Sequence, residues 1–123
     1  MRKIELHEVG PRDGFQNVSE YIPLETKIRI IDGLVTSGMR HVQITSFVSP
    51  KAIPQMKDAR ELAANCVGKY PDTDFFALVP NLRGAESAWE SGIKRVSYVV
   101  SLSESHNQAN IRRSHEESFA ELQ

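Results

Sequence analysis

Two copies of one short pattern constrain the fold of this chain more than any other feature. Residues 37–42 read Ser-Gly-Met-Arg-His-Val and residues 91–96 read Ser-Gly-Ile-Lys-Arg-Val, so the two segments match in residue type at every position. In each copy a helical pattern stops at the glycine, one apolar residue follows, and a strand-like run begins. The copies lie 54 residues apart and enclose two strand–helix units. This spacing predicts a parallel sheet with helical crossovers.

Four short runs are apolar and rich in β-branched or aromatic residues, which is typical of strands. They are Lys3–Val9, His41–Thr45, Asp74–Val79 and Arg95–Leu102. Helical patterns separate them. The first starts at Pro23 and ends at Gly38, the second starts near Ala59, the third runs from an Asn81 cap to Gly92, and the fourth begins near Ser114. The second is expected to bury Ala59, Leu62, Ala63 and Cys66, and the third Leu82, Ala85, Ala88 and Trp89.

The periodicity alone fits two α/β architectures equally well. Four units are half of a (β/α)₈ TIM barrel, which usually needs about 250 residues, and an open four-stranded α/β domain would also suit 123 residues. The final residues, SFAELQ, lie in a helical pattern with no residue that ends it. We therefore expect residues 1–123 to be the N-terminal part of one TIM-barrel domain that stops within the fourth helix.

Composition narrows the function classes. The formal net charge is -1 and no basic tract stands out, which argues against a nucleic-acid partner. No apolar run has membrane-spanning length, and the first residues are too polar for a signal peptide. Cys66 is the single cysteine and is expected to be a core residue. These features predict a cytoplasmic protein without a membrane partner.

The loop after the first strand carries the most reactive residue types, in the sequence VGPRDGFQN. Arg12 and Asp13 stand side by side between glycines. A carboxylate suits a hard divalent cation, and an arginine stabilises charge that develops on a carbonyl oxygen. The alternative is a surface turn that holds an Arg–Asp ion pair, because Gly, Pro and Asp favour turns.

Polar residues also mark the ends of later strands. Gln43 alternates with Val42 and Ile44, so its side chain should face away from theirs and alongside Thr45. A buried Gln43 without partners would cost about 1–3 kcal/mol, so it should point into a polar barrel mouth or bond to a neighbouring strand. The run 101–107 after the fourth strand is dense in polar groups, which suits either an acyl-binding loop or a solvated connection.

The four histidines show no metal-binding spacing. His7, His41, His106 and His115 form neither a His-x-His pair nor a His-Glu-x-x-His motif. Each is expected to be structural or solvent-facing.

Taken together, the motifs resemble a known family. VGPRDGFQN, TSFVSPKAIPQM, VPNLRGAESAWESG and SLSESHNQANIRRSHEESF, in this order, are similar to the N-terminal half of 3-hydroxy-3-methylglutaryl-CoA lyases. The Arg-Asp-Gly-x-Gln element marks a wider superfamily of metal-dependent lyases and condensing synthases, whereas the Val-Gly-Pro before it and the TSFVSPK stretch point to the lyases.

The resemblance implies a TIM barrel that cleaves 3-hydroxy-3-methylglutaryl-CoA, or a close 3-hydroxyacyl-CoA, to acetyl-CoA and acetoacetate with Mg²⁺ or Mn²⁺. Asp13 would be a metal ligand and Arg12 would steady the enolate-like oxygen. Gln16 and Gln43 would complete the catalytic set, with Gln16 holding the loop. Arg12, Thr45, Ser46 and Ser103 would contact the acyl-CoA substrate.

Two departures from the family pattern matter. Gln43 stands where the best-known members carry a glutamate, which removes an acid/base group. The family's paired histidines, asparagine ligand and catalytic cysteine loop belong to a second half that this sequence lacks, and Cys66 does not match that cysteine. The chain alone is therefore expected to be inactive, and to self-associate or pair with the rest of the barrel. An isopropylmalate-synthase-like condensing enzyme and a non-catalytic half-barrel module are the alternatives.

Overall fold

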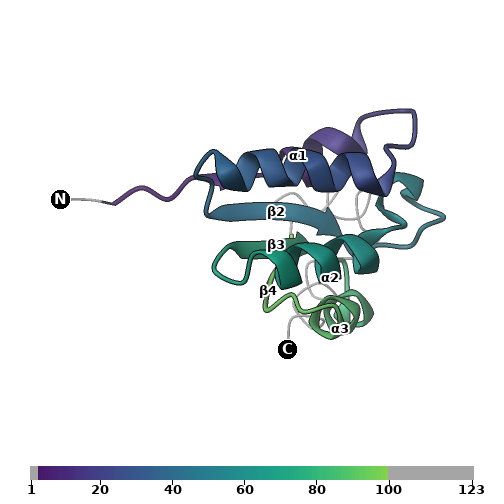
Figure 1. Ribbon diagram of the computed structural model, residues 1–123. Coiled ribbons are helices and arrows are strands. Elements are labelled where there is room, and N and C mark those ends of the chain that lie inside the picture. The colour runs from purple at the N-terminus through teal and green to yellow at the C-terminus, as the bar shows by residue number, and fades with distance from the viewer. Residues whose placement is uncertain (1–2, 100–123) are drawn as a thin grey trace.

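The computed structural model describes residues 3–99, which form one parallel sheet with three helices beside it (Figure 1). The strands are β1 (His7–Glu8), β2 (His41–Ser46), β3 (Asp74–Leu78) and β4 (Arg95–Ser97). They are hydrogen-bonded in chain order, and every neighbouring pair is parallel. In the wall of a (β/α)₈ barrel each new strand is added beside the previous one on the same side. In open doubly wound sheets the order of the strands reverses. The expected βα architecture is confirmed.

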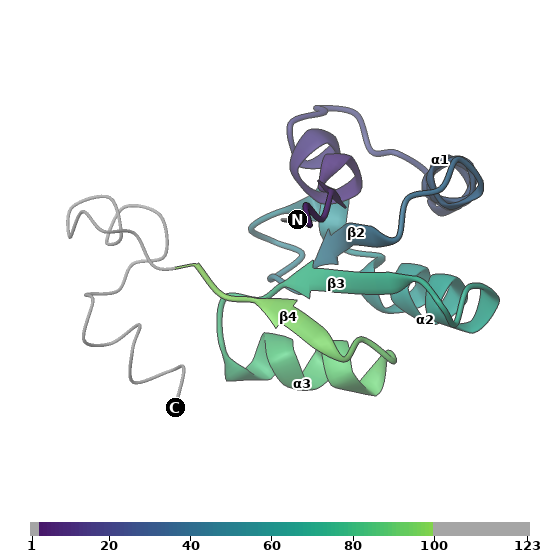
Figure 2. The ribbon, with the colours of Figure 1, turned by 90° about the vertical axis from the view of Figure 1, so that its left-hand side faces the viewer.

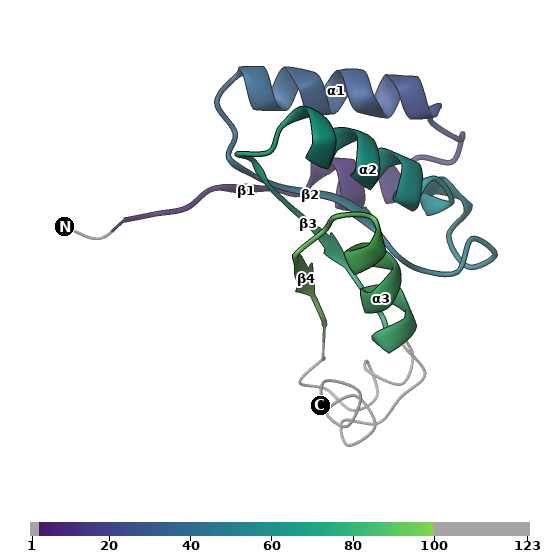
Figure 3. The ribbon, with the colours of Figure 1, turned by 60° about the horizontal axis from the view of Figure 1, so that its bottom comes forward.

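The helices α1 (Leu24–Thr36), α2 (Ala59–Lys69) and α3 (Leu82–Glu90) follow one another along one side of the sheet (Figures 2 and 3). Gly38 and Gly92 end the turns before β2 and β4 with φ angles of 106° and 95°, a region that favours glycine. The predicted Asn81 cap also forms, because its side-chain oxygen accepts a hydrogen bond from the Gly84 N–H at 2.8 Å. The helix expected near Ser114 lies outside the described residues.

The hydrophobic core lies between the sheet and these helices. The four α2 residues expected to be buried all contribute to it, as do Val42 and Ile44 of β2. A further member is Ile31 of α1, which is fully buried. The sheet face that carries Val42 and Ile44 is therefore covered by helices, and the opposite face holds the polar residues considered below.

Two strands are shorter than the sequence predicts. β1 covers His7–Glu8 rather than Lys3–Val9, because its partner strand β2 begins at His41, directly opposite His7. Residues 3–6 therefore extend beyond the sheet, and Ile4 is 86% exposed (Figure 1). β4 covers Arg95–Ser97 rather than Arg95–Leu102. Residues 98 and 99 are outside the strand, and the remainder of that prediction lies outside the described residues.

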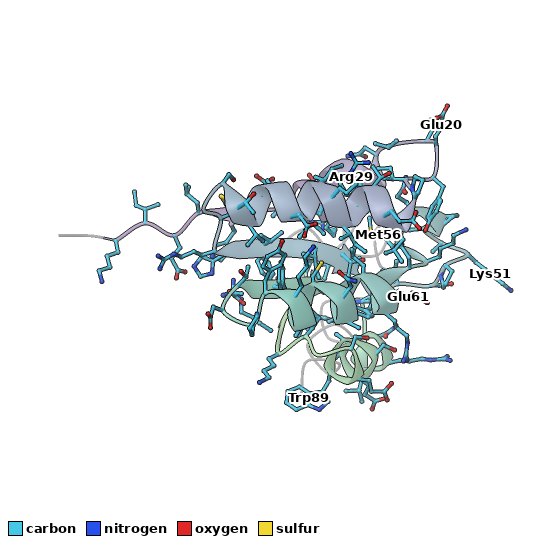
Figure 4. All side chains as sticks on the ribbon, viewed as in Figure 1. Glu20, Arg29, Lys51, Met56, Glu61 and Trp89 are labelled. Atoms are coloured by element: carbon cyan, nitrogen blue, oxygen red, sulfur yellow. The ribbon has the colours of Figure 1, made fainter. Side chains whose placement is uncertain are left out.

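Helix α3 buries only part of its predicted face: Ala88 is in the core and Ala85 packs against it, as expected, but Leu82 and Trp89 are not buried. Leu82 and Trp89 are 62% and 68% exposed, and Figure 4 shows Trp89 pointing away from the sheet. The buried residues of this helix are Gly84 and Ala88. A Cβ atom on Gly84 would lie 2.7 Å from the carbonyl oxygen of Phe47, so the helix approaches the chain after β2 through its smallest residues.

A buried ion pair ties α1 to the chain that follows β2. Lys27 Nζ lies 2.9 Å from Asp58 Oδ1, and both side chains are almost completely buried. Tyr21 donates to the same carboxylate at 2.8 Å. Nearby, the Gln55 side chain accepts from the Ile22 N–H. These contacts fix the long connection between β1 and α1.

No helix in the described part of the chain is long and apolar enough to cross a membrane.

Candidate functional site

The predicted reactive loop is a helical turn, η1 (Gly10–Gly14), directly after β1. The Val9 carbonyl accepts hydrogen bonds from the N–H groups of Arg12 at 3.1 Å and Asp13 at 2.7 Å. The turn packs against β2. Arg12 and Asp13 therefore stand on a defined backbone at the carboxyl-end edge of the sheet, where parallel α/β folds place their reactive groups.

Arg12 and Gln43 form the central contact of this edge. The Nε–H of Arg12 donates to Gln43 Oε1 at 2.8 Å, and Gln43 is only 4% exposed. Gln43 points away from the helix-covered face, as its alternation with Val42 and Ile44 predicts. The partner of its side-chain oxygen is an arginine from the preceding loop rather than the backbone of a neighbouring strand. The hydrogen bond holds Arg12 Nε. Because the guanidinium is planar, this bond also restrains the orientation of its two terminal nitrogens.

Asp13 is the exposed member of the site. Its side chain is 61% exposed, and one carboxylate oxygen lies 3.5 Å from Arg12 Nη1. The ion pair of the surface-turn alternative therefore exists, but at this distance and exposure it contributes little to stability. The Asn17 side chain donates to the Asp13 backbone oxygen at 3.0 Å, which steadies the turn and leaves the carboxylate available.

Asp13 fits a hard divalent cation as a single ligand. A carboxylate oxygen is a suitable donor for Mg²⁺ or Mn²⁺. Within residues 3–99, Asp13 belongs to no group of three histidine, cysteine or acidic side chains with converging ligand atoms. Two further histidine, cysteine or acidic ligands for such a cation are therefore not available within residues 3–99.

The other predicted site residues are placed less directly. Gln16 is exposed, lines a shallow hollow with Ser19 and Ile53, and has no hydrogen bond to Arg12 or Gln43 in the described structure. Thr45 and Ser46 are fully buried. Ser103 lies outside the described residues.

Thr45 and Ser46 bond within the protein. The Thr45 hydroxyl donates to Met56 Sδ at 3.5 Å and the Ser46 hydroxyl to the Leu78 carbonyl at 3.3 Å. A register shift between Gln43 and Thr45 interrupts the pairing of β2 with β3. Irregularities of this kind re-aim side chains near functional sites. Met56 belongs to η2 (Pro54–Met56), the short helical turn after β2 (Figure 4).

A second hollow opens between the chain after β2 and the start of α3. Its lining includes three basic side chains, Lys57, Arg60 and Arg83, together with Asn81. The sequence patterns do not single out the three basic residues, because Arg60 and Arg83 belong to different helices and come close only through the packing of α2 and α3.

Cys66 is a core residue, as expected. Burial raises the pKa of its thiol to about 12. The thiol therefore stays protonated near neutral pH and is a poor nucleophile.

Two histidines lie together at the opposite edge of the sheet, where the strands begin. His7 and His41 are register partners across β1 and β2, with ring centroids 4.9 Å apart. Glu5 joins them to form a group whose potential metal-ligating atoms all lie within 4.8 Å of one another. The sequence patterns treat each histidine separately and do not predict this pair. Local spacing could not reveal it, because the residues meet through strand pairing.

Comparison with known proteins places these features in context. The family model described as HMGL-like matches residues 3–123. Over 118 residues the chain is 43% identical to the 3-hydroxy-3-isohexenylglutaryl-CoA/hydroxy-methylglutaryl-CoA lyase of Pseudomonas aeruginosa and 44% identical to hydroxymethylglutaryl-CoA lyase YngG of Bacillus subtilis. Both alignments cover 96% of this chain but only 39% of the relative.

Solved structures agree with the sequence comparisons. A Bacillus subtilis HMG-CoA lyase superimposes with a TM-score of 0.90 at 43% identity, over 98% of this chain and 40% of that structure. An Acinetobacter HMG-CoA lyase, solved in complex with coenzyme A and 3-methylmalate, gives 0.89 at 38% identity, over 96% of this chain and 38% of that one. The parallel sheet and its helices correspond to the N-terminal part of these TIM barrels.

Proposed function

The chain belongs to the HMGL-like family, and from this we propose that it is part of a lyase that cleaves 3-hydroxy-3-methylglutaryl-CoA, or a close 3-hydroxyacyl-CoA, to acetyl-CoA and acetoacetate. The observation that carries the proposal is the Arg12–Gln43 contact beside an available Asp13 carboxylate. This contact lies at the carboxyl ends of the parallel strands, and the chain that contains it is similar to lyases.

The reaction makes specific demands on these residues. The tertiary hydroxyl must lose its proton, and the bond between the carbinol carbon and the CH₂ beside the thioester must break. The electron pair of that bond moves into the thioester as an enolate, which is then protonated to give acetyl-CoA. The carbinol carbon becomes the ketone of acetoacetate. A positive group near the thioester oxygen stabilises the charge that develops there.

Arg12 is suited to that role because Gln43 holds its side chain through a hydrogen bond to Nε. Gln43 occupies Nε, so the terminal nitrogens can face a substrate oxygen without a search over rotamers. A neutral glutamine holds the guanidinium through a hydrogen bond without offsetting its charge. Gln43 acts here as a positioning residue, and a glutamate at this position would add an acid/base group.

Asp13 would supply one oxygen ligand to a Mg²⁺ or Mn²⁺ ion. Such an ion, when bound, polarises hydroxyl and carbonyl oxygens and lowers the pKa of a ligated hydroxyl. The exposed carboxylate beside a fixed guanidinium supports this assignment. The same proposal gives Gln16 the support of the loop and Ser103 a contact with the substrate. Thr45 and Ser46 are fully buried and bond within the protein, so they would act on the substrate only through packing.

The acyl-CoA partner has a second candidate contact in the hollow whose lining includes Lys57, Arg60 and Arg83, of which Arg60 is paired with Glu90 at 3.1 Å. Coenzyme A carries phosphates, and clustered cationic side chains attract them. This hollow lies at the same edge of the sheet as Arg12, since it adjoins the carboxyl end of β2.

The protein would act as one barrel domain in the cytoplasm. We propose that residues 1–123 belong to a single TIM-barrel domain and pair with further barrel units, or with a second copy, at the sides of β1 and β4 that have no neighbouring strand within residues 3–99. Cys66, the one cysteine of these residues, is a buried free thiol, which suits a reducing compartment.

A substrate comparison tests the reaction class. A chimera would carry this chain in place of the matching part of the Bacillus subtilis lyase. We expect it to release acetoacetate from 3-hydroxy-3-methylglutaryl-CoA, and to form no condensation product from acetyl-CoA and a 2-oxo acid. The reverse preference would favour a condensing synthase. The isolated chain is expected to show no turnover.

A further inference from the structure

We propose that Glu5, His7 and His41 form a binding site for a zinc-class divalent cation at the edge of the sheet where the strands begin. The site is distinct from Asp13, which follows β1 at the opposite edge. It does not depend on the lyase proposal, because it rests on the cross-strand geometry of these residues alone.

The backbone holds the two imidazoles close together. His7 and His41 are paired in the parallel register of β1 and β2, so their Cα atoms are fixed by the sheet. The potential ligand atoms of the three residues already lie within 4.8 Å of one another. Tetrahedral zinc bonds of about 2.0–2.1 Å to nitrogen place ligand atoms roughly 3.3 Å apart. Small side-chain rotations therefore suffice, and Glu5 is exposed and precedes β1.

A carboxylate from β3 prepares His41 for coordination. His41 Nδ1 lies 2.9 Å from Asp74 Oδ2, and a carboxylate can only accept, so Nδ1 carries the proton. In the neutral ring Nε2 is then the unprotonated nitrogen, and it lies 3.5 Å from Glu5 Oε2. A carboxylate behind the distal nitrogen is the usual way in which a metal-binding histidine is oriented and made more basic.

Arg95 of β4 opposes cation binding because it is positively charged. Its removal should therefore raise the affinity for the cation, whereas removal of a ligand should lower it. Its guanidinium contacts Asp74 and lies 3.3 Å from His7 Nδ1. It also lies over the Phe76 ring at 4.5 Å, so it has other contacts if it leaves His7. Glu5 and Asp74 bring two negative charges against this one positive charge, and the cluster with neutral imidazoles is net negative.

The donor set selects the metal. Two imidazoles and one carboxylate suit zinc and similar first-row cations, whereas Mg²⁺ prefers oxygen ligands alone. A bound ion would connect the segment of residues 3–6 to the sheet through Glu5. The chemistry therefore points to a structural clamp on the N-terminal segment, with water in any open coordination position.

The test uses the full chain with Zn²⁺ by titration calorimetry and with Co²⁺ by visible absorption. We expect one saturable site that Mg²⁺ does not fill. His7→Val should lower Zn²⁺ affinity at least about tenfold, and Asp74→Asn should lower it about 10- to 100-fold. Arg95→Met should raise the affinity, a change that general loss of structure would not produce.

Matched controls separate this site from other ligands in the chain. His106→Ala/His115→Ala removes two histidines from outside the described residues, and Asp13→Ala removes the carboxylate of the opposite edge. Both should bind Zn²⁺ as the parent does. Glu5→Ala changes an exposed side chain, so it reports on the site even if His7→Val impairs folding. Unchanged affinity in Glu5→Ala and Asp74→Asn, or loss of binding in the His106→Ala/His115→Ala control, would overturn the proposal.

Discussion

Arg12 and Gln43 lie 31 positions apart in the sequence, yet Arg12 Nε donates a 2.8 Å hydrogen bond to the Gln43 side-chain oxygen. The bond joins the turn after β1 to the middle of β2. This one bond gives the buried Gln43 oxygen its donor and also restrains the Arg12 guanidinium. The stability of this region and its proposed chemistry therefore depend on the same atoms.

Replacement of Gln43 by glutamate should change the rate more than the stability. The shape is conserved and the bond to Arg12 becomes charge-assisted, so the melting temperature should change little. The new carboxylate restores an acid/base group, and we expect kcat of the chimera to rise on the order of tenfold or more. Steady-state kinetics and thermal unfolding check this pair of outcomes. A stability change without a rate change would assign Gln43 a purely structural role.

Substitution of Arg12 by alanine should leave the Gln43 side-chain oxygen buried without its donor. We expect a loss of about 1–3 kcal/mol in the free energy of unfolding, and a fall in kcat of about 100- to 1,000-fold because the fixed guanidinium is gone. A double-mutant cycle with Gln43→Ala isolates the pair. Strict additivity of Arg12→Ala and Gln43→Ala would contradict direct coupling.

The buried Lys27–Asp58 pair should matter for stability rather than chemistry. Lys27→Met leaves the Asp58 carboxylate buried without its cation, with an expected cost of about 3–5 kcal/mol. Urea unfolding of the chain measures it. The double variant Lys27→Met/Asp58→Leu removes both charges and should recover much of the loss. A double variant as unstable as the single one would show that the charges are not the cause.

Two glycine substitutions should act in opposite directions. Gly84→Ala forces a Cβ to within 2.7 Å of the Phe47 carbonyl oxygen, and should destabilise the chain by about 1–3 kcal/mol. Gly33 lies inside α1, and a Cβ atom added there would meet nothing within 4 Å. Gly33→Ala should stabilise by about 0.5–1 kcal/mol. Equal effects in chemical denaturation would contradict the close approach of α3.

Local pattern was enough to predict the order of strands and helices, because alternation, glycine stops and the Asn81 cap are local signals. It also located Arg12 and Asp13 at the end of the first strand. It was less successful where tertiary packing decides. The period of α3 allowed Leu82 and Trp89 to be buried, but Gly84 and Ala88 permit a closer approach and set the rotation of the helix.

Cross-strand contacts were the main gap. The Arg12–Gln43 bond and the His7–His41 pair both depend on the register between β1 and β2. The spacing of residues within one segment does not by itself show which residues of the two strands lie opposite one another. The sequence predicts that Gln43 needs a hydrogen-bond partner, but only the three-dimensional structure identifies Arg12 as that partner.

The most direct measurement is acetoacetate release by the chimera with and without the Asp13 carboxylate. Asp13 is 61% exposed, so Asp13→Ala should leave the melting temperature close to that of the parent. Turnover of 3-hydroxy-3-methylglutaryl-CoA with Mn²⁺ should be abolished in this variant, while Asp72→Ala, a change at another acidic residue, should retain it. Unchanged Mn²⁺-dependent cleavage by the folded Asp13→Ala variant would contradict the assignment of this edge as the metal-binding part of a lyase site.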